Sequence, residues 1–295
     1  MTMHKAGFVN IVGNPNVGKS TLMNLLMGER ISIATFKAQT TRHRIMGIIN
    51  TEEAQIVFSD TPGVLKPNYK LQESMLAFSE SALQDADVLL YVTDVVEKPD
   101  KNADFLKKVE KMEVPVLVLI NKIDLSNQKE LEALVEAWHE TIPQAEIFPI
   151  SATARFNVDN VLKRIMELLP DSPPYFGKDQ WTDKPARFFV TEIIREKILL
   201  YYDKEIPYAV EVVVEQFKES EKNIHINAVI YVERESQKGI IIGHQAVALK
   251  KVSTEARRTL EKFFGKHVYL EIFVKVDKDW RNSAKRLEAY GYKTD

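Results

Sequence analysis

The stretch GNPNVGKST, residues 13–21, decides the fold of the first part of the chain. It follows an apolar run, residues 6–12, and leads into a helix-forming stretch, residues 19–27, which Gly28 ends. It matches the pattern G-x-x-x-x-G-K-[ST], in which successive backbone N–H groups face a phosphate at the N-terminus of a helix. We therefore predict a strand, a phosphate-binding loop and a helix that together hold a nucleoside triphosphate.

Individual residues of this loop have expected contacts with the nucleotide. Lys19 would reach the β- and γ-phosphates, and Ser20 would hold Mg²⁺. The other residues expected to surround the phosphates are Gly13, Asn14, Asn16, Val17, Gly18 and Thr21. A glycine turn with an incidental lysine is the alternative, and the strand and helix on either side argue against it.

The composition is that of a globular protein with about two domains. The chain has 295 residues, of which 45% are hydrophobic and 28% charged, and its formal net charge is −2. Its apolar runs are shorter than the roughly 20 residues that a membrane span needs. The chain contains no cysteine, which excludes disulfides and thiolate metal sites, and its first residues do not form a signal-peptide pattern. We therefore expect a cytoplasmic protein.

Residues 1–169 alternate short apolar runs with helix-like stretches, which predicts an α/β domain. Uninterrupted apolar runs are typical of parallel strands buried on both faces by helices. The expected parallel strands are residues 6–12, 55–59, 88–93, 116–121 and 147–150, with residues 44–50 as an antiparallel neighbour.

Residues 170–185 contain four prolines and are expected to link this domain to a second one, residues 186–295. Alternating apolar side chains and a helical apolar stripe predict a small α+β domain, with a sheet packed by helices on one face. The expected strands are residues 208–217, 224–234 and 268–276, and the expected helices are residues 187–202 and the stripe Leu249, Val252, Ala256, Leu260 and Phe263.

Two further motifs predict which base is bound. NKID, residues 121–124, follows an expected strand, and open α/β sheets bind ligands at the carboxyl ends of their strands. The Asp124 carboxylate can accept hydrogen bonds from N1–H and the exocyclic amine of guanine, whereas adenine has no donor at N1. Lys122 would lay its stem over the ring, and SAT, residues 151–153, would support the base. The candidate guanine-binding residues are Asn121, Lys122, Asp124, Ser151, Ala152 and Thr153.

DTPG, residues 60–63, follows another expected strand and is the expected sensor of the γ-phosphate. Asp60 would bind Mg²⁺ through water and the Gly63 N–H would contact the γ-phosphate, with Thr61 and Pro62 between them. Many GTPases orient the attacking water with a glutamine after this glycine, but here that residue is Val64. We therefore expect slow hydrolysis unless a backbone group, a water network or a bound K⁺ assists it.

Two polar positions near the phosphates have alternatives. Within KAQTTRHR, residues 37–44, Thr41 is expected to contact Mg²⁺ in the triphosphate state, with Thr40 as the alternative, although a solvated basic loop would have the same composition. Asn16 is either a ligand of K⁺ or a turn residue. The predicted catalytic residues are Lys19, Thr41 and Gly63, and the predicted Mg²⁺ ligands are Ser20, Thr41 and Asp60.

Together, GNPNVGKS, QTTRHR, DTPG, NKID and SAT resemble the TrmE–Era branch of GTPases related to translation factors. The segment from VERESQKG to FVKV, residues 232–276, resembles the K-homology (KH) RNA-binding domain of the Era family. The resemblance covers essentially the whole chain in the same domain order. It implies a P-loop GTPase domain, with helices on both faces of a mostly parallel sheet, followed by a KH-type domain.

Membership of the Era family would imply a function for both domains. Such proteins hydrolyse GTP and assist assembly of the small (30S) ribosomal subunit. Their KH domain binds single-stranded RNA near the 3′ end of the small-subunit ribosomal RNA, and the GTP state governs this association. The implied cofactors are GTP or GDP and Mg²⁺, with K⁺ as a candidate. Peripheral contact with the inner membrane is also linked to the family, and we expect mostly a monomer.

KH domains bind about four nucleotides with a G-x-x-G loop at the start of a helix. The corresponding residues here are Gly243, His244, Gln245 and Ala246. Alanine is tolerated if Ala246 has helical dihedral angles, which we expect, and weakens binding if the position needs a positive φ. Residues 238–266 contain seven basic residues against two acidic ones, typical of a phosphate-binding face. The expected RNA contacts among them are Lys250, Lys251, Arg257 and Arg258.

Other functions stay open from the sequence alone. The basic segment would also suit a protein- or membrane-docking module, or a solvated helix face, but no amphipathic helix with an aromatic and basic face stands out. A related GTPase that acts in tRNA modification is a narrower alternative. The absence of cysteines and of extra domains argues against it.

Overall fold

The computed structural model describes residues 4–97 and 102–292. The chain divides into two compact units, one made mainly of residues up to Asp183 and one made mainly of residues from Lys184 onward. The domain limits expected from the sequence, 1–169 and 186–295, stay predictions.

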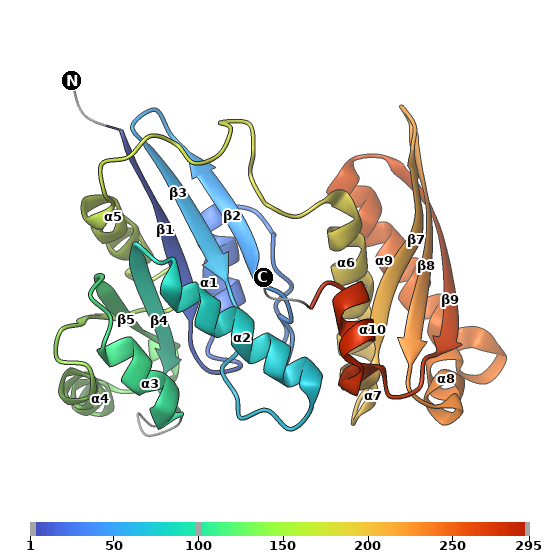
Figure 1. Ribbon diagram of the computed structural model, residues 1–295, viewed down its shortest axis with the longest axis horizontal. Coiled ribbons are helices and arrows are strands. Elements are labelled where there is room, and N and C mark those ends of the chain that lie inside the picture. The colour runs from blue at the N-terminus through green and yellow to red at the C-terminus, as the bar shows by residue number, and fades with distance from the viewer. Residues whose placement is uncertain (1–3, 98–101, 293–295) are drawn as a thin grey trace. The chain divides into compact units, whose positions relative to one another are not determined.

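The first unit contains a six-stranded sheet in the order β2-β3-β1-β4-β5-β6 (Figure 1). Its strands are β1 (Lys5–Val12), β2 (Ile45–Asn50), β3 (Ala54–Asp60), β4 (Val88–Asp94), β5 (Val116–Asn121) and β6 (Glu146–Pro149). Neighbouring strands are parallel except for β2, which pairs antiparallel with β3. The predicted α/β fold and its antiparallel strand are therefore confirmed.

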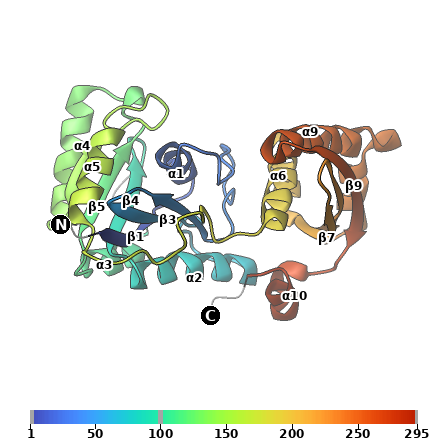
Figure 2. The same cartoon turned by 90° about the horizontal axis from the view of Figure 1, so that it is seen from above.

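Helices cover both faces of this sheet, since Figure 2 shows α1 on one side and α2 and α3 on the other. The helices are α1 (Lys19–Met27), α2 (Lys70–Gln84), α3 (Ala103–Glu110), α4 (Gln128–Thr141) and α5 (Val158–Leu168), with a 3₁₀ turn at Ile123–Leu125. Buried residues of β4, β5, α2, α3 and α4 form one apolar core, which includes Val64 and Trp138. Strands β3 and β4 are buried along their whole length, as their uninterrupted apolar runs indicated.

The segment expected to link the domains, residues 170–185, is held against the first unit as far as Asp183. The side-chain oxygen of Gln55 accepts hydrogen bonds from the backbone N–H groups of Tyr175 (2.7 Å) and Phe176 (3.0 Å). Further along, the N–H of Ile48 on β2 donates to the carbonyl of Trp181 (2.9 Å). This segment therefore covers the otherwise unpaired edge of β2.

The second unit contains a three-stranded sheet in the order β7-β8-β9. Its elements are α6 (Ala186–Tyr201), α7 (Ile206–Ala209), β7 (Glu211–Glu219), β8 (Asn223–Val232), α8 (Glu235–Ile242), α9 (Val247–Phe264), β9 (His267–Val276) and α10 (Ala284–Ala289), with 3₁₀ turns at His244–Ala246 and Trp280–Asn282. Strand β8 is antiparallel to β7 and parallel to β9. Apolar side chains of the strands and of α6, α8 and α9 form its core, which confirms the predicted α+β unit.

Three local predictions in this unit are wrong at their ends. Tyr202 lies just outside α6, because its backbone is extended there. Tyr208 lies in helix α7 rather than in a strand, because Pro207 fits the first turn of a helix. Arg234 lies outside β8, because the side chain of Gln237 accepts a hydrogen bond from its N–H (3.1 Å) at the start of α8. In the part of the chain that the structure describes, no helix has the length and apolar character needed to cross a bilayer.

Candidate nucleotide-binding site and KH loop

The phosphate loop, residues 13–20, bends through residues with a left-handed backbone. Gly18 has φ 99°, and a Cβ atom there would lie 2.3 Å from Nδ2 of Asn121. Both the backbone conformation and the space therefore require glycine. Asn16 has φ 67°, a conformation in which asparagine is enriched, and it also lines the cavity described below, so its place in the turn is compatible with a role as a K⁺ ligand.

Lys19 lies inside this loop, with only 6% of its surface exposed. Its Nζ donates hydrogen bonds to the carbonyls of Gly13 (3.0 Å) and Asn14 (2.8 Å). Burial lowers the pKa of Lys19 to about 8, while the charges of Asp60 and Glu97 act in the opposite direction. A phosphate in the loop would favour the charged form, so the site is suited to an anionic ligand.

Ser20, Thr41 and Asp60 converge from three segments of the chain. Ser20 Oγ lies 2.8 Å from Thr41 Oγ1 and 2.7 Å from Asp60 Oδ2. Asp60 Oδ1 is buried and has no hydrogen-bond partner among the described residues, and burial raises the pKa of Asp60. Mg²⁺ prefers oxygen ligands such as these, and a cation would stabilise the buried carboxylate, so the cluster fits Mg²⁺.

Of the two candidate threonines, Thr41 is the one that faces this cluster. Thr40 Oγ1 instead lies 2.7 Å from Thr35 Oγ1 and donates a hydrogen bond to the carbonyl of Lys37 (2.5 Å). The geometry therefore favours Thr41 over Thr40 as a residue that faces the metal.

Val64, which replaces the glutamine of many GTPases, is directed into the protein core. Its residue surface is only 3% exposed, and its side chain packs with residues of α2, α3 and α4. Its N–H donates to the carbonyl of Gly13 (3.0 Å), and its carbonyl accepts a hydrogen bond from the side chain of Asn102 (3.0 Å). In this conformation Val64 therefore does not orient a water molecule.

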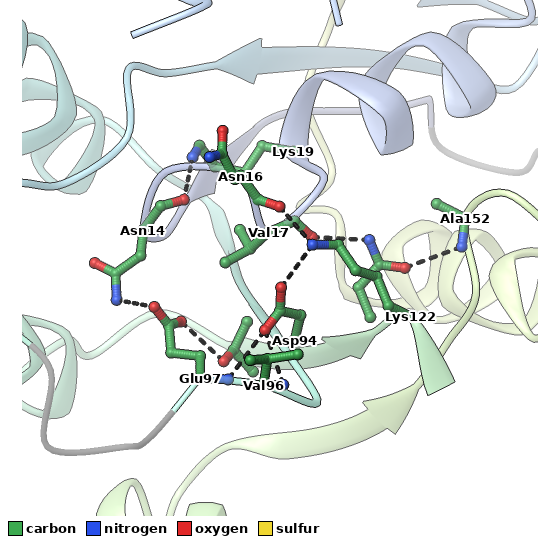
Figure 3. Close-up of polar contacts among 11 residues, drawn as sticks. Asn14, Asn16, Val17, Lys19, Asp94, Val96, Glu97, Lys122 and Ala152 are labelled. Carbon is green, nitrogen blue, oxygen red and sulfur yellow. Dashed lines mark hydrogen bonds and ion pairs between the residues drawn. The ribbon is translucent and has the colours of Figure 1, made fainter. Parts of the chain in front are cut away.

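Hydrogen bonds connect the predicted base-binding residues among three loops, and Figure 3 shows Lys122 and Ala152 within this network. Asn121 Nδ2 donates to the carbonyl of Val17 (2.9 Å), and Asn121 Oδ1 accepts from the N–H of Ala152 (3.0 Å). Ser151 Oγ donates to Asp124 Oδ1 (2.5 Å). The phosphate loop and the NKID and SAT loops therefore support one another.

A cavity of about 370 Å³ opens among these loops. The predicted residues that line it are Asn16, Gly18, Lys19, Ser20, Thr21, Thr40, Thr41, Gly63, Asn121, Lys122, Asp124, Ala152 and Thr153. The exposed apolar side chains of Phe36 and Leu125 also line it, and no motif had singled them out.

The other predicted residues lie behind this lining and hold it in place. Thr61 Oγ1 donates to the carbonyl of Ile11 (2.7 Å), and the carbonyl of Pro62 accepts from Ser79 Oγ (2.8 Å). The side chain of Asn14 donates to Glu97, away from the cavity (Figure 3). These residues support the phosphate loop and the DTPG segment from the protein interior.

In the second unit, the KH loop, residues 243–246, joins α8 to α9. Gly243 has φ 72°, and a Cβ there would lie 2.7 Å from that of Ala248, so the position requires glycine. Gln245 (φ 49°) and Ala246 (φ 58°) are also left-handed. The expectation that Ala246 has helical dihedral angles is therefore wrong, because this residue completes the turn before α9. A left-handed backbone costs an L-residue about 1–2 kcal/mol.

The predicted RNA contacts lie on α9, which follows this loop. Lys250 is exposed, and Lys251 Nζ lies 4.1 Å from the centre of the Tyr201 ring. Arg257 and Arg258 form ion pairs of 2.9 Å with glutamates of the same helix. Exposed pairs of this kind contribute about 1 kcal/mol or less, so they would not prevent contact with phosphates.

Comparisons with known proteins agree with both units. A family model described as 50S ribosome-binding GTPase matches residues 8–122, and one described as KH domain matches residues 205–281. A crystal structure of an Era variant from Aquifex aeolicus, bound to GDP·AlF4⁻, is 39% identical, with a TM-score of 0.94, and the match covers 98% of this chain and 100% of that one.

A second solved structure is Era in complex with MgGDPNP and nucleotides 1506–1542 of 16S ribosomal RNA. It is also 39% identical, with a TM-score of 0.94, and the match covers 99% of this chain and 100% of that chain. Identity at this level over nearly the whole chain shows that the protein is a GTPase with a KH domain and belongs to the Era family.

Proposed function

We propose that this protein is a GTP-hydrolysing switch that binds small-subunit ribosomal RNA near its 3′ end and assists assembly of the 30S subunit. The strongest support is its match, over nearly the whole chain, to an Era structure that contains nucleotides 1506–1542 of 16S ribosomal RNA. The KH loop and the basic residues of α9 offer groups suited to single-stranded RNA.

In this proposal, the first unit binds GTP or GDP through the residues around the cavity. Lys19 contacts the β- and γ-phosphates, and the backbone of the phosphate loop surrounds them. Asp124 accepts hydrogen bonds from the guanine ring, and Lys122 covers its face. The connected loops described above would hold these groups in position before the nucleotide binds.

Ser20, Thr41 and, through water, Asp60 would hold Mg²⁺, which supplies positive charge to the phosphates when bound. Lys19 and the Gly63 N–H would stabilise the negative charge on the transferred phosphoryl group. Thr41 would also keep residues 37–44 ordered until the γ-phosphate leaves.

Because Val64 is directed into the core, we propose that K⁺ assists hydrolysis, with the exposed side chain of Asn16 as a ligand. Single-turnover hydrolysis should then be faster in K⁺ than in Na⁺, and Asn16→Ala should remove the difference. Equal rates in the two salts would refute this part of the proposal.

RNA binding is tested with the full chain, loaded with GDP or a non-hydrolysable GTP analogue. A short RNA that copies the 3′ end of the small-subunit RNA is compared with a scrambled RNA. We expect selective binding that is tighter in the GTP state. Replacing both Lys250 and Lys251 with Glu should weaken binding at least about tenfold, because phosphate contacts are lost. Replacing both Lys218 and Lys222 with Glu, an equal charge change at exposed positions of β7 and of the turn after it, is the control.

The proposal also includes the location of the protein in the cell. We place the protein in the cytoplasm, mostly as a monomer, with contact to the inner membrane at its surface. Flotation with vesicles of anionic lipid tests this contact. Binding to vesicles without any preference between the two RNAs would refute the RNA proposal and favour a membrane-docking role for the second unit.

A further inference from the structure

Asp94 is a buried carboxylate beside the base-binding loop that no sequence motif had singled out. It ends β4, pairs with Asn121 across the β4–β5 ladder, and is 7% exposed. Its Oδ1 accepts hydrogen bonds from the N–H groups of Val96 and Glu97, both at 3.0 Å. Its Oδ2 accepts one from Lys122 Nζ at 2.7 Å (Figure 3). The turn after β4 therefore fixes the carboxylate, which presents its second oxygen to Lys122.

Lys122 connects this carboxylate to the phosphate loop. Its backbone is left-handed, with φ 62° and ψ 33°, and its Nζ also donates to the carbonyl of Asn16 (2.6 Å). The side chain lines the nucleotide cavity and is one-third exposed. Two acceptors therefore hold the ammonium end of a residue that lines the cavity.

The physical effect of this arrangement is preorganisation. Ordering a free lysine side chain costs up to about 2 kcal/mol of rotamer entropy, which an unheld lysine would lose when the base binds. A hydrogen bond between an ammonium group and a carboxylate is charge-assisted and about twice as strong as a neutral one. Asp94 thus orders Lys122 before the nucleotide arrives.

We propose that Asp94 is a positioning residue for guanine-nucleotide binding, which acts through Lys122 on both the base and the phosphate loop. This inference rests on the proposed function, in which Lys122 covers the guanine ring. Asp94 does not line the cavity, so its loss should weaken GDP and GTP binding alike and leave the hydrolysis step unchanged.

Asp94→Asn is the test substitution. Its amide keeps an oxygen for the N–H groups of the turn but presents an NH₂ group, which cannot accept a hydrogen bond, to Lys122. We expect the dissociation constants of fluorescent GDP and a GTP analogue to rise about tenfold, mainly through faster release in stopped-flow experiments. The value of kcat at saturating GTP should stay within about twofold of the parent.

A double-mutant cycle separates positioning from a structural role. On a Lys122→Met background, Asp94→Asn should weaken GDP binding no further, because the partner through which it acts is gone. Asp94→Glu keeps the charge and should stay within about threefold of the parent. The control is Glu80→Gln, which breaks an exposed ion pair with Lys108 (2.6 Å) and should leave nucleotide binding unchanged.

Four results would overturn the inference. If Lys122→Met weakens GDP binding but Asp94→Asn does not, or if the two effects add fully, Asp94 does not act through Lys122, and the proposed function stands. If Asp94→Glu loses as much affinity as Asp94→Asn, the effect belongs to the turn rather than to the charge. If Lys122→Met itself leaves GDP binding unchanged, the role of Lys122 in the proposed function fails, and the inference fails with it.

Discussion

The phosphate loop and the KH loop both lead into a helix, and both contain three left-handed residues. In the phosphate loop these are Gly13, Asn16 and Gly18, all of residue types that tolerate a positive φ. In the KH loop they are Gly243, Gln245 and Ala246, so two of the three are unfavourable there. The phosphate loop is thus nearly free of backbone strain, whereas the KH loop is strained.

The two loops also differ in what supports them. Lys19, Asn121 and Lys122 all donate hydrogen bonds to carbonyls of the phosphate loop. The KH loop is exposed from His244 onward, and its turn is closed by a local hydrogen bond from the Ala246 N–H to the Gly243 carbonyl (3.2 Å). Distant contacts therefore determine the shape of the first loop, and its substitutions should have larger effects.

The largest effect is expected for Gly18→Ala. The added Cβ would collide with Asn121, and the backbone would be strained at φ 99°, so the loop and the base-binding loop must move apart. We expect GDP affinity to fall about 100-fold or more and the free energy of unfolding to fall by about 2 kcal/mol. Calorimetric titration and urea unfolding measure the two quantities.

Gly28→Ala is the matched control for this prediction. Gly28 ends the same helix at φ 69°, but a Cβ there would meet no atom within 4 Å. It should therefore lower stability by about 1 kcal/mol and leave GDP affinity within about threefold of the parent. Equal losses of affinity in the two variants would show that backbone strain, rather than the contact with Asn121, matters in this loop.

A smaller effect is expected when the pH is raised. Nucleotide binding at the phosphate loop should depend on pH, whereas RNA binding at the KH loop should not. Burial lowers the pKa of Lys19 to about 8, and a bound phosphate would raise it again. Binding should therefore take up about half a proton at pH 8, and the dissociation constant should approach a tenfold increase per pH unit above it. RNA binding through arginines and exposed lysines should change little between pH 7 and about 8.5.

Calorimetry of GDP binding in two buffers of different ionisation enthalpy counts the protons taken up. Absence of proton uptake at pH 8 would contradict the assignment to Lys19. The lowered pKa of Lys19 also affects stability. Between about pH 8 and pH 10.5 the unfolded chain keeps a proton on Lys19 that the folded protein has lost. The contribution of Lys19 to the free energy of unfolding therefore rises with pH in this range. The variant Lys19→Met should lack this rise.

The smallest effect is expected for Ala246→Gly, which should raise the free energy of unfolding, whereas the glycine-to-alanine substitutions should lower it. Glycine removes the strain of the left-handed position, so the free energy of unfolding of the second unit should rise by up to about 1 kcal/mol. RNA affinity should increase no more than about threefold, because the parent loop already has this conformation. Ala248→Gly, inside α9, should destabilise instead. A destabilising effect of Ala246→Gly would show that the KH loop is not strained at this position.

Local patterns were sufficient to predict much of the fold and the site. Helix α1 begins at Lys19 and ends at Met27 as expected, and the NKID motif begins at Asn121, the last residue of β5. Strand alternation, helical spacing and the phosphate-loop pattern depend on residues close together in the chain, and so they can be read without knowledge of tertiary contacts.

Contacts between distant segments decided the features that the patterns did not reveal. In the sequence, Asp94 is an ordinary acidic residue at the end of a strand, and only the fold places it in hydrogen-bond contact with Lys122. The hydrogen bond from the side chain of Asn102 to the carbonyl of Val64 likewise forms only in the fold. The side chain of Gln55 accepts a hydrogen bond from Tyr175 in the linker, residues 170–185. Composition alone had shown only that this segment is rich in proline.

The sequence by itself therefore determined the two units, their order and the motifs around the nucleotide. The tertiary structure alone decided how Lys122 is held, where Val64 points and which backbone conformation Ala246 adopts. The physical reason is that a side-chain hydrogen bond depends on which distant groups pack beside it, and that the left-handed backbone of Ala246 depends on how α8 and α9 pack on either side of the turn. Residue spacing carries no record of either.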